Sequence, residues 1–78
     1  MYTYRVNIDD KIIFGPICHN YSTAIENAKN HLNKLKSEGY STSDIPDIQK
    51  PFKVQFSCDN LEGFIEVGKI IFVDLDTD

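Results

Sequence analysis

The chain has 78 residues, and its 8 basic side chains against 12 acidic ones give a formal net charge of -4. A chain of this length forms one small domain with a single thin core, which excludes a deep catalytic cleft of the usual kind. The acidic balance disfavours nonspecific binding to nucleic acid or to an anionic membrane, because both attract proteins with a positive field. A basic partner fits this charge better.

The first segment of the chain predicts a β-hairpin. Apolar and polar side chains alternate over residues 2–8, which is the period of a strand with one buried face. Asp9 and Asp10 form a short polar turn, and residues 11–14 resume an apolar run, so we expect the two segments to pair through a tight two-residue loop. The Gly-Pro pair at 15–16 ends the second strand, because proline has no N–H group for the ladder.

A helix is predicted from about residue 23 to residue 38. Ser22 or Thr23 can serve as the N-cap, and Thr23 with Glu26 matches the capping box, in which each side chain bonds a free amide of the first turn. Gly39 and Tyr40 then match a Schellman ending. One apolar stripe at helical spacing is expected to face the core: Ala24, Ile25, Ala28, Leu32 and Leu35.

The second half predicts three further strands after an ordered crossing segment at 41–51. Alternation is clear over 52–58, and the remainder predicts strands at about 62–67 and 70–75 with Gly68 and Lys69 as the turn. The resulting order, ββαβββ, predicts an α+β fold in which one helix packs on a largely antiparallel sheet. The whole chain, residues 1–78, is expected to be a single domain.

Acidic charge is concentrated in the second half of the chain. Residues 1–40 hold five basic and four acidic side chains, whereas residues 41–78 hold three basic and eight acidic ones. Asp74, Asp76 and Asp78 alternate with other residues, so an extended chain would present them on one face about 6.6 Å apart. The alternative for Asp76 and Asp78 is a solubilising chain end. The predicted partner-binding residues are Asp59, Glu62, Glu66, Asp74 and Asp76.

Cysteine and histidine residues give no motif for metal binding or nucleophilic catalysis. Cys18, His19, His31 and Cys58 lack the spacing of zinc ligands, and the acidic row lacks the glycine and distal glutamate of a calcium loop. Both cysteines continue an apolar alternation, which predicts two buried thiols that pack as small hydrophobic groups. Neighbouring residues of a strand point to opposite faces, so Cys18 and His19 do not form a nucleophile and base. We expect no metal, no cofactor and no catalytic residue.

The start of the sequence shows no basic and apolar leader, and no apolar run approaches the roughly 20 residues of a membrane span. We therefore expect a cytosolic protein. A row of carboxylates can imitate a phosphate backbone in a groove rich in lysine and arginine. The sequence thus predicts a small non-enzymatic inhibitor or interaction protein. It would occupy a basic, nucleic-acid-binding surface of a larger protein or nucleoprotein complex, which could be a nuclease. Direct binding to nucleic acid or to membranes is not expected.

The most specific hypothesis is a phage or mobile-element anti-defence protein of the anti-CRISPR kind. It follows from small size, acidity and residue usage typical of an A/T-rich genome. One alternative is an immunity protein or antitoxin that neutralises a basic toxin nuclease. Another is a small ligand-binding or thiol-dependent enzyme domain that uses Cys18 and His19. The sequence leaves the oligomeric state open.

Overall fold

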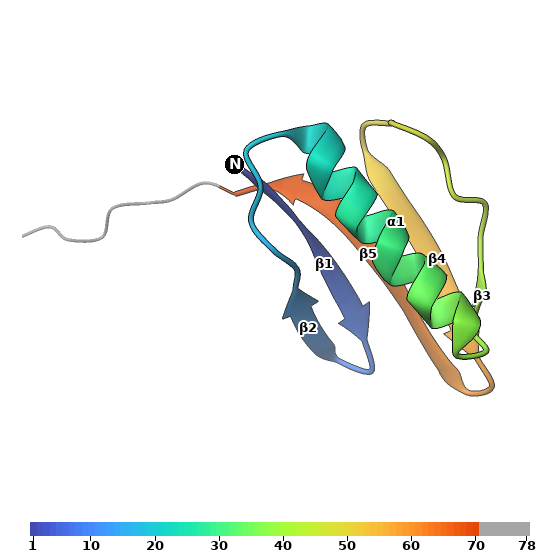
Figure 1. Ribbon diagram of the computed structural model, residues 1–78. Helices are drawn as coiled ribbons and strands as arrows, with labels where there is room; N and C mark the ends of the chain where they lie inside the picture. Colours follow the sequence, from blue (N-terminus) through green and yellow to red (C-terminus); the bar gives the residue numbers. More distant parts are fainter. Residues whose placement is uncertain (71–78) are drawn as a thin grey trace, which may run out of the picture.

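The computed structural model describes residues 1–70 and has two layers, with one helix on one face of a five-stranded sheet (Figure 1). The strands lie in the order β2-β1-β5-β4-β3, and each neighbouring pair is antiparallel. The predicted α+β class and ββαβββ order are confirmed. The elements are β1 Tyr2–Ile8, β2 Lys11–Phe14, α1 Tyr21–Ser37, β3 Ser41–Thr42, β4 Phe52–Cys58 and β5 Leu61–Lys69.

The last three strands differ in part from those predicted. β3 lies in the segment that we expected to cross the surface without secondary structure. β5 continues through Gly68 and Lys69, so the predicted turn there is wrong. The strand continues because Gly68 and Lys69 pair with Thr3 and Tyr2 of β1, which extends the ladder past the glycine. The predicted strand at 70–75 falls, apart from its first residue, outside the described residues.

The helix begins two residues before its predicted first residue. Asn20 is the N-cap, and its side chain makes no capping hydrogen bond. Thr23 and Glu26 lie inside the helix, so the predicted capping box is wrong. A contact between distant segments accounts for the earlier start, because the ring of Tyr21 packs edge-on against Tyr2 with 5.3 Å between ring centroids.

The predicted end of the helix is confirmed. Gly39 has a φ of 102°, which is the left-handed region that favours glycine. The N–H of Tyr40 donates to the C=O of Leu35 at 3.0 Å, and the N–H of Gly39 donates to the C=O of Lys36 at 3.0 Å. These two hydrogen bonds are those of a Schellman motif, and they turn the chain back towards the sheet.

The core lies between α1 and the inner face of the sheet. Four residues of the predicted helical stripe are buried there, and the fifth, Leu35, is partly buried at the edge. Both cysteines are only partly buried, so the prediction of two buried thiols is wrong. Cys18 bridges to Tyr2 at one end of the sheet, and Cys58 ends β4 at the other. The buried hydrophobic residues are Tyr4, Val6, Ala24, Ile25, Ala28, Leu32, Phe52, Val54, Phe56, Ile65 and Val67.

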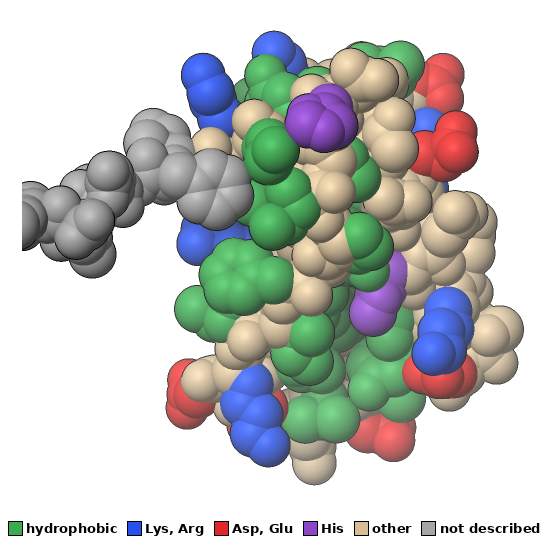
Figure 2. Space-filling view, turned by 60° about the vertical axis from the view of Figure 1, so that its left-hand side comes forward, with side chains coloured by type: hydrophobic (Ala, Val, Ile, Leu, Met, Phe, Trp, Pro, Cys, Tyr) green, Lys and Arg blue, Asp and Glu red, His purple; other side chains and the backbone are tan. Residues whose placement is uncertain are grey.

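The predicted β-hairpin is confirmed, and its second strand forms one edge of the sheet. All four residues of β2 are exposed, three of which are large and hydrophobic. Figure 2 shows hydrophobic side chains gathered on this side of the molecule. Thr3 fixes the chain that leaves β2, because its hydroxyl donates to the carbonyl oxygens of Gly15 and Pro16 at 2.9 and 3.0 Å.

Candidate functional site

Two turns and the first residues of β5 place four carboxylates at the same end of the sheet. Asp9 and Asp10 form the β1–β2 turn, and Asp59 follows β4 in the β4–β5 turn. Because β1 and β5 pair antiparallel, the end of β1 meets the start of β5. Glu62, the second residue of β5, lies at that end as well. All four side chains are exposed.

Backbone geometry accounts for the aspartates in these turns. Asp9, Asp10 and Asp59 have φ values of 50°, 64° and 53°, in the left-handed region. Aspartate and asparagine adopt this region more readily than most residues, because their short polar side chains bond locally. A two-residue hairpin turn of this kind also matches the right-handed twist of its strands. The turns therefore fix where these carboxylates lie.

The four carboxylates line a hollow of about 920 Å³, which we call the acidic hollow. Much of its lining comes from residues that alternate with the core residues of their strands and so point to the outer face of the sheet. Among residues 1–70, Lys11 is the one basic residue of the lining. Ammonium and guanidinium groups are the ligands that such a lining favours. The outward polar residues are Asn7, Gln55 and Ser57, and the β3 segment adds Ser41 and Ser43.

Glu66 does not belong to the acidic hollow. Its carboxylate accepts hydrogen bonds from Nη2 of Arg5 at 2.6 Å and from Nε at 3.1 Å. Lys53 lies opposite Glu66 on the other neighbouring strand. Arg5 therefore offsets the charge of this carboxylate, whereas Nζ of Lys53 lies 4.2 Å from the ring centroid of Phe64. Of the five predicted partner-binding residues, the structure brings together Asp59 and Glu62.

The remaining two predicted residues, Asp74 and Asp76, lie outside the described residues. Asp9 and Asp10 take part in the acidic hollow but were missed, because we expected the negative charge in the second half of the chain. Their signal was the two-residue turn itself, which becomes informative only once β1 is known to pair with β5. Counting charges in each half of the sequence could not show that these carboxylates lie close together.

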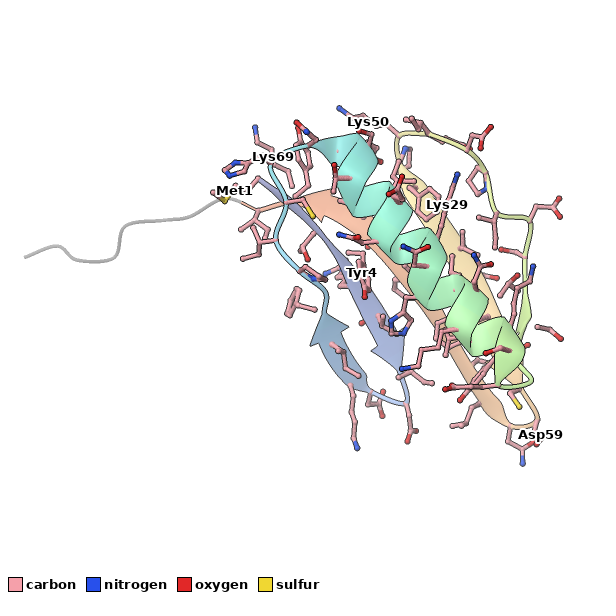
Figure 3. All side chains as sticks on the ribbon, viewed as in Figure 1. Met1, Tyr4, Lys29, Lys50, Asp59 and Lys69 are labelled. Atoms are coloured by element: carbon pink, nitrogen blue, oxygen red, sulfur yellow. The ribbon has the colours of Figure 1, made fainter. Side chains whose placement is uncertain are left out.

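Basic side chains lie at both ends of the sheet, whereas the carboxylates of the acidic hollow lie at one. Figure 3 shows Asp59 at one end of the molecule and Lys50 and Lys69 at the opposite end. Lys50 is held there by aromatic rings, because its Nζ stands 4.7 Å from the ring centroid of Tyr21. Lys34 and Lys36 in the last turn of α1 lie at the same end as Asp59, so the attraction of a basic partner is local to the acidic hollow.

The cysteines and histidines do not assemble into a site. Cys18 and Cys58 lie at opposite ends of the sheet, and Asn27 donates from Nδ2 to Sγ of Cys18 at 3.2 Å. In the described part of the chain, no three histidine, cysteine, aspartate or glutamate side chains are placed to hold a metal ion. Neither the histidine-cysteine pair nor a zinc site gains support from this arrangement.

His31 forms a partly buried pair with Tyr4. The hydroxyl of Tyr4 lies 3.2 Å from Nδ1 of His31, and the two ring centroids are 5.5 Å apart. Burial lowers the pKa of His31, and the positive charge of Lys34 lowers it further, against a smaller opposite effect of Glu38. Burial also raises the pKa of Tyr4. At neutral pH both side chains are therefore uncharged, and the tautomer of the imidazole determines which of the two donates this hydrogen bond.

The lowered pKa of His31 predicts a pH dependence of stability. When the pH falls below about 6.5, the usual pKa of histidine, the unfolded chain takes up the proton more readily than the folded protein, so the free energy of unfolding decreases. We expect the variant His31→Gln to lose this decrease between pH 7.5 and pH 5.5. Urea denaturation followed by circular dichroism measures it. His19→Gln is the matched control, and equal pH slopes for wild type and His31→Gln would contradict the assignment.

Comparisons with family models, with curated proteins and with solved structures found no match. Within residues 1–70, α1 is neither long nor apolar enough to cross a membrane. A proposal for function therefore starts from the geometry and charge of the acidic hollow.

Proposed function

We propose that this protein is a small cytosolic, non-enzymatic inhibitor that binds a basic, nucleic-acid-binding surface of a larger protein through its acidic hollow. The observation that carries this proposal is the meeting of two turns at one end of the sheet. Together with Glu62 of β5 they bring four exposed carboxylates to a hollow of about 920 Å³, whose lining within residues 1–70 holds one lysine. No catalytic group is part of this proposal.

The acidic hollow suits lysine and arginine side chains for two reasons. Carboxylates form short, charge-assisted hydrogen bonds with guanidinium and ammonium groups, as phosphates do. Hydroxyl and amide side chains of the lining, such as Ser57 and Gln55, offer further hydrogen bonds to a lysine or arginine side chain that enters the hollow. A protein surface that binds phosphate groups would find similar hydrogen-bond acceptors in the acidic hollow.

Electrostatic attraction acts mainly on the rate of association. The net charge of -4 and the concentration of carboxylates at one end steer a basic partner towards that end. The matching class of partner is a nuclease whose nucleic-acid groove is lined with basic residues. An anti-defence inhibitor and an immunity protein need this same surface. The identity of the nuclease that is inhibited therefore distinguishes these two functions.

A binding and inhibition experiment tests the proposal. Purified CRISPR effector nucleases and basic toxin nuclease domains are titrated with the protein at 50 and 300 mM NaCl. We expect the protein to inhibit one of these nucleases. The affinity should fall as the salt concentration rises, because charges on the surface are screened within about 10 Å at 0.1 M ionic strength. In the acidic-hollow variant, Asp9, Asp10 and Asp59 become Asn and Glu62 becomes Gln. We expect it to associate on the order of 10-fold more slowly.

A matched control removes the same charge elsewhere. It changes the exposed residues Glu26, Glu38, Asp44 and Asp47 to their amides, and we expect it to inhibit nearly as well as wild type. Asparagine tolerates the left-handed turn positions, and exposed charges contribute little to stability, so both variants should fold. Equal inhibition by both variants would contradict the proposed surface. Lack of binding to every nuclease tested would contradict the proposed class of partner.

A further inference from the structure

The free edge of β2 combines exposed hydrophobic side chains with unpaired backbone. Ile12, Ile13 and Phe14 are 53%, 54% and 66% exposed, and Ile17 just beyond the strand is 55% exposed. An edge strand that presents both features is a template for pairing with another strand.

The hairpin with β1 determines which backbone groups of β2 point outward. Hydrogen-bonded and non-hydrogen-bonded residue pairs alternate along an antiparallel ladder. The N–H of Gly15 donates to the C=O of Tyr4 at 2.8 Å, so this pair is of the bonded kind. By alternation, Ile13 also bonds to β1, whereas the N–H and C=O groups of Ile12 and Phe14 point away from it. Within residues 1–70, no strand pairs with these four outward groups.

We propose that two copies of this chain associate through antiparallel pairing of their β2 strands, with Ile13 opposite the partner's Ile13. This two-fold arrangement puts Ile12 of each copy opposite the partner's Phe14. All outward groups of these residues then meet outward groups of the other copy, which gives four hydrogen bonds between the subunits. The result is a continuous sheet of ten strands with both helices on the same face.

Neighbouring registers fit less well. Centring the pair on Ile12 would place Phe14 opposite Asp10, whose φ of 64° takes it out of the extended conformation that a ladder needs. Centring it on Phe14 would place Ile12 opposite the partner's Pro16, which has no N–H to donate. The register centred on Ile13 is the one that avoids both residues.

The side chains support the same arrangement. Ile12 and Phe14 point to the outer face of the sheet, so each packs beside its counterpart from the other copy. The exposed parts of the hydrophobic residues at this edge come to on the order of 1,000 Å² over two copies, near the lower limit for a specific interface. We therefore expect micromolar self-association. Because each copy carries a net charge of -4, added salt should strengthen it, which is opposite to the effect expected for a basic partner.

Sedimentation velocity at 5 to 500 µM tests the dimer. We expect wild type to shift from monomer to dimer over this range, and Ile13→Lys to raise the dissociation constant at least 10-fold, because two like charges would meet on the two-fold axis. Ile48→Lys is the matched control, since Ile48 is 69% exposed on the segment between β3 and β4, the two strands farthest from β2 in the sheet. A wild type that stays monomeric, or equal dimerisation by both lysine variants, would overturn the proposal.

Disulfide trapping tests the register. In a background with Cys18→Ser and Cys58→Ser, we expect the Ile13→Cys variant to cross-link rapidly under mild oxidation, because residues of a non-hydrogen-bonded pair lie within disulfide range. Ile12→Cys should cross-link at least 10-fold more slowly, since its counterpart lies two pairs away. Equal rates would overturn this register. We expect Ile13→Lys to inhibit the target nuclease as wild type does, because Ile13 does not line the acidic hollow, so the two proposals fail independently.

Discussion

Replacing Leu32 by alanine is expected to lower the free energy of unfolding by about 2 to 5 kcal/mol. Leu32 is 0% exposed and lies in the middle of the helical stripe that packs on the sheet. Alanine would leave a cavity there, because neighbouring buried residues cannot collapse fully into the space. A domain of this size has a total stability of about 4 to 12 kcal/mol, so the loss is a large share of it.

Urea denaturation followed by circular dichroism measures this loss. Leu35→Ala on the same helix is the control, because Leu35 is only partly buried and should cost less. Leu32→Met keeps most of the side-chain volume and is expected to cost less than about 1.5 kcal/mol. A loss below about 1 kcal/mol for Leu32→Ala would mean that this position does not face the core.

Two glycines on β5 are expected to respond in opposite ways to the same substitution. A Cβ at Gly63 would lie 2.2 Å from the backbone oxygen of Asn7 and 2.8 Å from Cζ of Phe56. Gly63→Ala should therefore destabilise the protein by about 1 to 3 kcal/mol, because backbone of β1 and a buried ring would have to move. The glycine is needed there for the close approach of β1 and Phe56, and not for a turn.

Gly68→Ala provides the contrast, since nothing lies within 4 Å of a Cβ at this position. We expect a change between zero and a gain of about 1 kcal/mol, because alanine reduces the conformational freedom of the unfolded chain. The difference in free energy of unfolding between the two variants is the quantity to measure. Equal effects would mean that Gly63 does not lie as close to Asn7 and Phe56 as the structure shows.

Two strands with a strong local signal were predicted with their boundaries, and the buried face of the helix was predicted without its start. Each of these elements buries one row of apolar side chains. The spacing of that row is visible in a short stretch of sequence, as the alternation over residues 2–8 and 52–58 and the helical stripe show. Gly39 is similar, because a residue with positive φ after a helix is a local requirement. These elements were sufficient for the fold class.

The helix start and the length of β5 depended on contacts that a local reading does not contain. Tyr21 joins the helix because its ring meets Tyr2, which lies 19 positions earlier. Gly68 favours a turn by its residue type, but its pairing with β1 keeps it in the strand. In both cases a partner distant in sequence outweighed the local preference.

The candidate site divides along the same line. By itself, the sequence determined the net charge, the turns that carry aspartate, the exposed character of Asp59 and Glu62, and the absence of metal-ligand spacing. Only the tertiary structure decided which carboxylates share a surface, because β1 and β5 are far apart in sequence and their pairing joins Asp9 and Asp10 to Asp59. The same pairing sets Arg5 against Glu66 and removes that carboxylate from the site. Charge is a property of residues, but an electrostatic surface depends on distances between them, and the sheet order sets those distances.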